Sequence, residues 1–331
     1  MTTQADSSNG QDGARQAPWP GGPNSIELPM TLFRYVLATS RVHQAALVVM
    51  TTAVFLLELV PLELQRRIVN DLVKGREYRA IVILCAVYCG AVLVQGGTKL
   101  VLNIYRSWVG ERAVRDLRTR VDTMGEIADD PEIQGIEAAM MVAEVEPVGG
   151  FVASSISEPL LQGGILLSTM AYMIHLDPWM ALAAAAIFVP QLVIVPFLQS
   201  AIVRRTDMRI RILRLLSIGI VLPNGRQKQR ATGGHAHIDQ VFEIGMKIFR
   251  LKFTVNFLMN FCNHLQVVAA LLFGGWYVLH NELVIGGVVA FISAVGRLND
   301  PWGDLINYFR DLSTTNVKYR LIAKALHAPT R

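Results

Sequence analysis

The chain has little charge and little cysteine for its length of 331 residues. Only 17% of its residues are charged, whereas soluble domains average about 25%. Its three cysteines, Cys85, Cys89 and Cys262, stand in apolar stretches and form neither a CxxC string nor a Cys/His metal spacing. These shortages exclude a small disulfide-stabilised scaffold, and the cysteines are expected to act as small apolar side chains.

Long apolar runs take the place of the missing charge. Hydrophobic residues make up 52% of the sequence and the mean hydropathy is +0.37. A bilayer-crossing helix needs ~20 apolar residues, and six runs approach that length, at about 44–62, 80–104, 156–174, 179–199, 254–279 and 284–301. This segregation excludes a disordered chain, a nucleic-acid module and an ordinary soluble enzyme. We therefore expect an all-α polytopic membrane protein with six transmembrane helices.

Two of the runs are weaker than the others. Glu158 and Gln162 interrupt the third run, and Arg297 and Asp300 close the sixth.

Residues 1–28 are rich in Ser, Gly, Gln and Pro without an apolar period, and are expected to form a flexible N-terminal tail.

The distribution of Lys and Arg predicts the orientation of the spans. Eleven basic residues but only three acids lie in the connection 200–253, whereas the hinge 175–178 and the turn 280–282 contain no Lys or Arg. Because cytoplasmic loops are enriched in Lys and Arg, both termini are expected in the cytoplasm, with the protein in the cell (inner) membrane. One segment disobeys the rule: residues 64–79, predicted outside, carry Arg66, Arg67, Lys74, Arg76 and Arg79.

The two connections predicted on the inner side, about 105–155 and 200–253, are unusually long. Apolar residues recur at helical spacing in 107–128 and 238–253, so spans two and five are expected to continue as helices into the cytoplasm. Turn-forming strings, Asp129-Asp130-Pro131 and Pro223-Asn224-Gly225, mark a reversal in each connection. The alternative is an amphipathic helix lying on the membrane, which the balanced charge of 111–126 disfavours.

Several strings resemble the transmembrane domain of exporter-type (type IV) ABC transporters over about residues 30–327. Gly110-Glu111-Arg112-Ala113-Val114-Arg115-Asp116-Leu117-Arg118 resembles the family's GER-x-x-R-x-LR segment. The string 283–291, LVIGGVVAF, is similar to the entry of the family's sixth helix, and Pro301 and 317–322 resemble the proline and the ending of that helix. The segment 129–135 keeps little of the family's aromatic turn. The resemblance implies a transmembrane domain over 29–327, with a short end at 328–331.

The resemblance also implies that transport and ATP hydrolysis are carried out by different polypeptide chains. No G-x-x-x-x-G-K-[ST] string occurs in the 331 residues, so the nucleotide-binding domain is expected to be missing from this chain. No cofactor is expected on the chain itself, while ATP and Mg would bind a separate ABC ATPase subunit or a partner half-transporter. A second transmembrane subunit would complete a homodimer or heterodimer, and nucleic acid is not an expected partner. Short coupling helices near 128–136 and 216–227 would dock on the ATPase, with contacts from Asp130, Pro131, Glu132, Pro223, Asn224 and Gly225.

Polar residues inside the runs are the candidates for a substrate pathway, because they are costly in lipid. Asn256, Asn260, Asn263 and His264 recur at helical spacing and can share one face, which either lines a wet cavity or joins helices by hydrogen bonds. Glu58 and Lys99 are expected to snorkel to the interface rather than pair. Arg297 and Asp300 are expected at the inner end of run six.

No metal or catalytic site is expected. His235 and His237 have no third ligand near them in the sequence, and no acid pair or Ser/His set supports catalysis. The expected function is that of a permease subunit moving a substrate by alternating access. The alternative is a non-transporting regulatory or truncated subunit derived from such a transporter; an unrelated membrane enzyme or receptor is the weakest interpretation.

Overall fold

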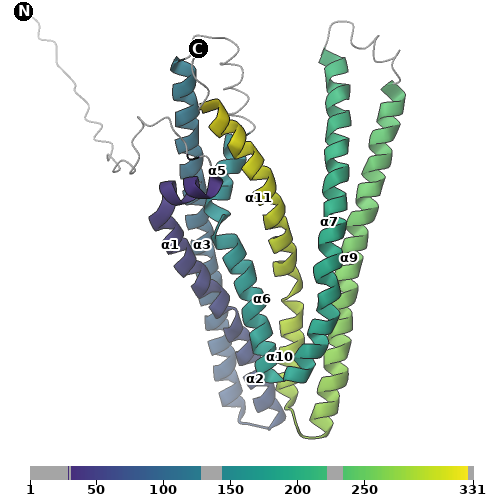
Figure 1. The fold of residues 1–331 in the computed structure, drawn as a ribbon. Helices are drawn as coiled ribbons and strands as arrows, with labels where there is room; N and C mark the ends of the chain where they lie inside the picture. The colour runs from purple at the N-terminus through teal and green to yellow at the C-terminus, as the bar shows by residue number, and fades with distance from the viewer. Residues whose placement is uncertain (1–28, 30, 128–143, 222–233, 327–331) are drawn as a thin grey trace, which may run out of the picture. The chain divides into compact units, whose positions relative to one another are not determined.

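A computed structural model describes residues 29, 31–127, 144–221 and 234–326, and these ranges contain α-helices and no strand (Figure 1). The prediction of an all-α protein is confirmed. The predicted tail 1–28 and the end 328–331 lie outside the ranges. The helices are α1 (Leu32–Leu57), α2 (Leu59–Val73), α3 (Tyr78–Ile127), α5 (Val145–Ser154), α6 (Ser157–Leu176), α7 (Pro178–Val221), α9 (Gly234–Leu279), α10 (Ile285–Gly296) and α11 (Asn299–Leu326).

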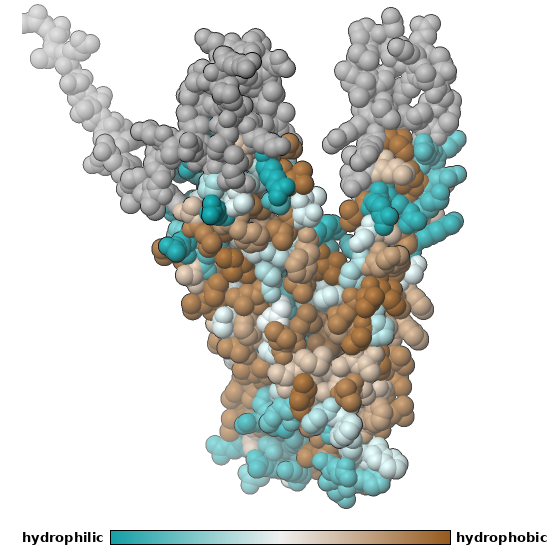
Figure 2. Space-filling view, viewed as in Figure 1, coloured by the Kyte–Doolittle hydropathy of each residue, from teal (hydrophilic) through white to brown (hydrophobic). Residues whose placement is uncertain are grey.

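Five helical stretches in the described ranges are long and apolar enough to cross a membrane. They are Leu32–Val73, Tyr78–Asp122, Ser157–Leu176, Pro178–Thr206 and Ile238–Leu279, and they contain the first five predicted runs. Apolar side chains cover much of the helix surface visible in Figure 2. Leu93 and Leu167, for example, are each 75% exposed. Such an extensive apolar exterior suits lipid rather than water, so the protein is a multi-pass membrane protein.

The structure corrects the prediction of a sixth continuous span. Run 284–301 does not form one helix, because α10 has only 12 residues and ends at Gly296. Arg297 has φ −92° and ψ 0°, outside the helical region, and α11 begins two residues later at Asn299. Polar residues Arg297, Asn299 and Asp300 stand where a continuous apolar helix would need hydrophobic ones. The described residues therefore contain five candidate spans rather than six, and the sixth run is divided between α10 and the start of α11.

The expected helical extensions are present as continuous helices. α3 has 50 residues and α9 has 46, so they extend for about 75 Å and 69 Å at 1.5 Å per residue. Both exceed what a bilayer core of ~30 Å can contain. The segments 107–127 and 238–253 belong to these helices, as their apolar spacing predicted.

The residues form two compact units, and the first unites 29–49, 102–157 and 310–326 among those described. Its centre is Tyr35, whose hydroxyl donates to Asp116 Oδ2 at 3.0 Å and whose ring lies 5.5 Å from that of Tyr319. Tyr319 donates to the carbonyl of Pro29, and burial raises the pKa of its phenol. These contacts join the beginning of α1, the later part of α3 and the end of α11.

The string that resembles the GER segment packs this first unit. Gly110 and Val114 face α5, where a Cβ on Gly149 would lie 2.4 Å from Val114 Cγ2 and 2.6 Å from the Val114 backbone nitrogen. The absence of a side chain at Gly149 is therefore what lets α5 lie directly on α3. Asp116 Oδ2 accepts a hydrogen bond from Arg120 Nε at 3.0 Å, in addition to the one from the Tyr35 hydroxyl.

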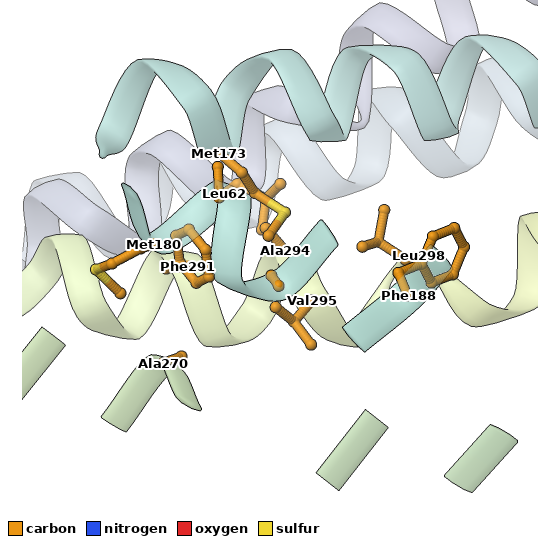
Figure 3. Close-up of a cluster of buried hydrophobic side chains, with 11 residues drawn as sticks. Leu62, Met173, Met180, Phe188, Ala270, Phe291, Ala294, Val295 and Leu298 are labelled. Carbon is orange, nitrogen blue, oxygen red and sulfur yellow. The ribbon is translucent and has the colours of Figure 1, made fainter. Parts of the chain in front are cut away.

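The second unit unites 50–101 and 158–309, and its core lies where five helices meet (Figure 3). Leu62 of α2, Met173 of α6 and Phe291 of α10 are almost fully buried there, with Phe188 of α7 and Ala270 of α9 beside them. α7 packs along α9, and α10 packs against both α2 and α9. Small residues permit this: a Cβ on Gly286 would lie 2.3 Å from the carbonyl oxygen of Arg66.

Short connections close one end of the second unit, and their local chemistry explains where the helices stop. Asp177 Oδ1 accepts the Met180 N–H at 2.7 Å, so an Asp–Pro pair caps the beginning of α7. Gly75 (φ 65°) and Asn281 (φ 57°) adopt the left-handed conformation after α2 and α9, and the backbone bonds Arg76 N to Asp71 O and Glu282 N to Tyr277 O complete Schellman motifs. Figure 2 shows this end as a hydrophilic surface.

Candidate functional site: polar groups within the membrane spans

The four predicted pathway residues do not all lie in one environment. All belong to α9, but Asn256, Asn260 and His264 are exposed, whereas Asn263 is half-buried and its Oδ1 is buried without a hydrogen-bond partner. The predicted helical spacing of the four residues is confirmed, because α9 is continuous through the whole segment.

Two glutamines that the sequence analysis did not select are the most buried polar side chains of this helix pair among the residues whose burial the structure describes. Gln266 of α9 and Gln191 of α7 are both 0% exposed. Gln266 Nε2 donates to the carbonyl of Ala184 on α7 at 3.3 Å. Gln266 Oε1, Gln191 Oε1 and Gln191 Nε2 are buried and have no partner.

The antiparallel packing of α7 and α9 places these amides in one row. Gln266 lies opposite Ala184, and Gly245 lies opposite Arg209. The same register places Gln191 opposite residues 259–260, about 10 Å along the helices from Gln266. Asn263 lies between these two levels. We call Gln191, Asn263 and Gln266 the amide row.

The amide row costs stability in this arrangement. A buried amide without a hydrogen bond costs roughly 1–3 kcal/mol in proteins, and lipid offers no replacement partner. Pro190 and Pro196 add to the polarity of α7, because each lacks an N–H and leaves the carbonyl four residues earlier without its usual helical donor. Groups held at such a cost are candidates for function rather than for stability.

Signals for the two missed glutamines were present in the sequence. Gln266 extends the polar spacing 256, 260 and 263 by one more turn, and Gln191 is the single polar residue between two prolines of an apolar run. Sequence reasoning had no means to determine that both positions lie along the same helix interface, because that depends on how α7 and α9 pack.

A second polar feature of the same unit joins two breaks in helices. Arg297 Nη1 donates to the carboxylate Oε2 and to the backbone carbonyl of Glu58, each at 2.8 Å. Glu58 separates α1 from α2, and Arg297 separates α10 from α11. The expectation that Glu58 snorkels to the interface is thus wrong: it forms an ion pair, with its side chain 14% exposed.

A third polar group lies near the beginning of α6. Gln162, 7% exposed, donates to Glu158 Oε1 at 2.8 Å and to Asp304 Oδ2 at 3.2 Å. Gln162, one of the two residues that weakened the third run in the sequence, therefore joins α6 to α11.

The predicted coupling residues Asp130, Pro131, Glu132, Pro223, Asn224 and Gly225 lie outside the residues that the structure describes. Within the described residues, no group of three His, Cys, Asp or Glu side chains is arranged to hold a metal ion.

Comparison with known proteins finds a distant relative of this sequence. The chain is 23% identical over 234 residues to the ATP-dependent lipid A-core flippase of Syntrophus aciditrophicus. The alignment covers 65% of this chain and 38% of the flippase, so the chain matches well under half of that protein's length. No family model matches the chain. The similarity supports a relationship to exporter-type ABC transporters, in agreement with the resemblance carried by the GER-like string.

Proposed function

We propose that residues 29–327 act as the membrane-spanning permease of an exporter-type ABC transporter. The substrate would cross by alternating access, driven by ATP hydrolysis on a separate ATPase subunit or a partner half-transporter. The amide row between α7 and α9 carries this proposal, together with the distant similarity to a flippase.

The amide row supports alternating access through its unmet hydrogen bonds. Gln191 Oε1 and Nε2 and Gln266 Oε1 have no partner in this conformation. A second conformation that admits water or a polar part of the substrate between α7 and α9 would satisfy them. The unpartnered amides raise the free energy of the present conformation and so bring it closer to that of the second conformation. A protein that switches between two conformations requires a small free-energy difference between them.

The energy source lies outside the residues that the sequence contains. A Walker A lysine and its glycine-rich loop do not occur in the 331 residues, so nucleotide chemistry requires other residues. Coupling would pass through the turns containing Asp130, Pro131 and Glu132 and Pro223, Asn224 and Gly225. Long helices such as α3, α7 and α9 suit this task because a rigid rod transmits a displacement from end to end.

The assembly would be a dimer of transmembrane subunits, homomeric or heteromeric, in the cell (inner) membrane with both termini in the cytoplasm. These features rest on the positive residues of 200–253 and on the resemblance to the transporter family.

ATPase measurements test the proposal. Membranes containing this chain and a candidate ATPase or half-transporter should show vanadate-sensitive hydrolysis above that of the partner alone. Gln191→Met, which keeps side-chain volume and removes the amide, should reduce substrate-dependent hydrolysis while leaving complex formation unchanged. Lys74→Met, a change at an exposed residue away from α7 and α9, is the control.

Two results would contradict the permease. Hydrolysis that is the same with and without the chain would favour the non-transporting regulatory subunit. Equal hydrolysis by the Gln191→Met variant and the control would remove the amide row from the pathway.

A further inference from the structure

We propose that α2 and α6 form a binding site for the anionic head group of a membrane lipid. The proposal concerns the basic segment that the predicted topology left unexplained, and it does not depend on transport. The site is an open pocket of about 630 Å³ in the second unit.

The polar side of the pocket carries a net positive charge. Glu63, Arg66 and Arg67 of α2 line it, with Tyr172 and His175 of α6. Glu63 is contacted by Arg66 Nε at 2.8 Å and by Arg67 Nε at 2.9 Å. One carboxylate thus meets two guanidinium groups, which leaves one positive charge unbalanced among the three residues.

Arg67 is the group with spare hydrogen-bonding capacity. Its hydrogen bond to Glu63 uses Nε alone, and its two terminal nitrogens make no hydrogen bond to the described residues. Its side chain is 64% exposed. A guanidinium held at one nitrogen can still present its other edge to a phosphate, which is the planar two-point geometry that Arg favours.

The remaining lining of the pocket is apolar, and this apolar wall favours a lipid. Leu59, Val60 and Leu64 line the pocket on the same helix, α2. Arginines beside a short apolar wall match a molecule with a charged head and a hydrocarbon chain. A free inorganic anion has no apolar part that could contact this wall.

The pocket is held in place from both ends of α2. Arg297 binds Glu58 just before the helix, and Asn70 Oδ1 accepts the Gly286 N–H at 2.8 Å near its end. Leu62 is buried in the core between these points. The Tyr172 hydroxyl donates to Glu63 Oε2 at 3.2 Å and ties the carboxylate to α6. The arginines therefore project from a fixed helix rather than from a loop.

Lipid binding to the purified full chain tests the site. Native mass spectrometry in a neutral detergent can compare phosphatidylglycerol with phosphatidylcholine of the same acyl chains. Arg67→Gln should weaken binding of the first phosphatidylglycerol about tenfold, since charge-assisted hydrogen bonds are lost. Phosphatidylcholine binding should stay unchanged. Arg79→Gln, the same charge change on an exposed residue of the same basic segment outside the pocket, should have little effect.

The apolar wall has its own test. Val60→Ser, at a partly exposed position, should weaken phosphatidylglycerol binding without changing the net charge. Inorganic phosphate should fail to displace the lipid.

Three outcomes would overturn the assignment. Equal losses for Arg67→Gln and Arg79→Gln would mean diffuse attraction to the basic segment. Equal affinity for the two lipids would mean that no anion is recognised. Displacement by inorganic phosphate, with Val60→Ser unchanged, would indicate a site for free phosphate instead.

Discussion

Individual polar side chains in this protein differ in how many of their hydrogen-bonding groups have a partner, and that difference sets what each side chain contributes to stability. Gln44 and Gln191 are both buried glutamines within candidate spans. Gln44 Nε2 donates to the carbonyl of Val152 at 2.8 Å and to Ser40 Oγ at 3.2 Å, and only its Oε1 has no partner. Gln191 has no partner for either end of its amide.

The two glutamines should therefore respond oppositely to the same substitution. Gln44→Met removes two hydrogen bonds and should lower the midpoint of thermal unfolding, at a cost of about 1–3 kcal/mol. Gln191→Met removes only an unsatisfied group and should leave the midpoint unchanged or raise it. Thermal unfolding of the detergent-solubilised variants, followed by size-exclusion fluorescence, provides the measurement. A clear loss of stability in Gln191→Met would show that its amide has a partner after all.

Adjacent glycines of α5 offer a second contrast between residues. A Cβ on Gly149 would meet the backbone nitrogen of Val114 at 2.6 Å, whereas a Cβ on Gly150 would have nothing within 4 Å. Gly149→Ala should destabilise the protein by about 1–3 kcal/mol, because the clash involves backbone that has to move. Gly150→Ala should be neutral or stabilising by up to ~1 kcal/mol, since Ala is the better helix former. The same unfolding measurement applies, and similar midpoints for both variants would contradict the close packing of α5 on α3.

At the scale of helices, the ion pair between Glu58 and Arg297 determines how four of them are joined. It bridges the break between α1 and α2 and the break between α10 and α11. Arg297 also binds the Glu58 backbone carbonyl, a group that a helix break exposes. Polar residues are thereby tolerated within segments that the sequence marked as spans.

Removing one partner of this ion pair should destabilise the protein more than removing both partners. Arg297→Gln leaves a mostly buried carboxylate uncompensated and should cost roughly 3 kcal/mol, while Glu58→Gln combined with Arg297→Gln should recover part of that loss. The exposed pair of Lys247 and Glu243, at 3.4 Å, is the control, and Lys247→Gln should cost no more than about 1 kcal/mol. A double-mutant cycle on unfolding midpoints gives the coupling. Additive effects of the two substitutions would show that the pair is not coupled.

At the scale of the whole molecule, the proposed permease function requires a partner that provides ATP hydrolysis. Asn224 stands in a predicted coupling turn between α7 and α9. A cysteine introduced at Asn224, in a variant lacking the three native cysteines, should crosslink to the ATPase partner, because the turn is expected at the docking surface. A cysteine at Glu282, in the turn between α9 and α10, should not, because that turn is predicted on the opposite side of the membrane. Capture at both positions or at neither would contradict the proposed coupling.

Much of the fold followed from the spacing of apolar residues. Continuous runs and helical periods predicted that the helices α3 and α9 extend beyond the bilayer, because period and length are local properties that the chain displays directly. The division of the last run was harder to predict. Arg297 reads in the sequence as the charged end of a span, and only its bond to Glu58 explains why the helix breaks there.

The sequence by itself determined that this protein is helical, crosses a membrane several times and carries an excess of basic residues beside one connection. Such features depend on composition and local order, and lipid enforces them by penalising every unpaired backbone group. Only the tertiary structure decided how the polar groups are arranged: the amide row of Gln191, Asn263 and Gln266 along one helix interface, the pair of Glu58 and Arg297, and the pocket around Arg67. Each joins residues far apart in the chain, and their partnership depends on how the helices pack rather than on any pattern along one of them.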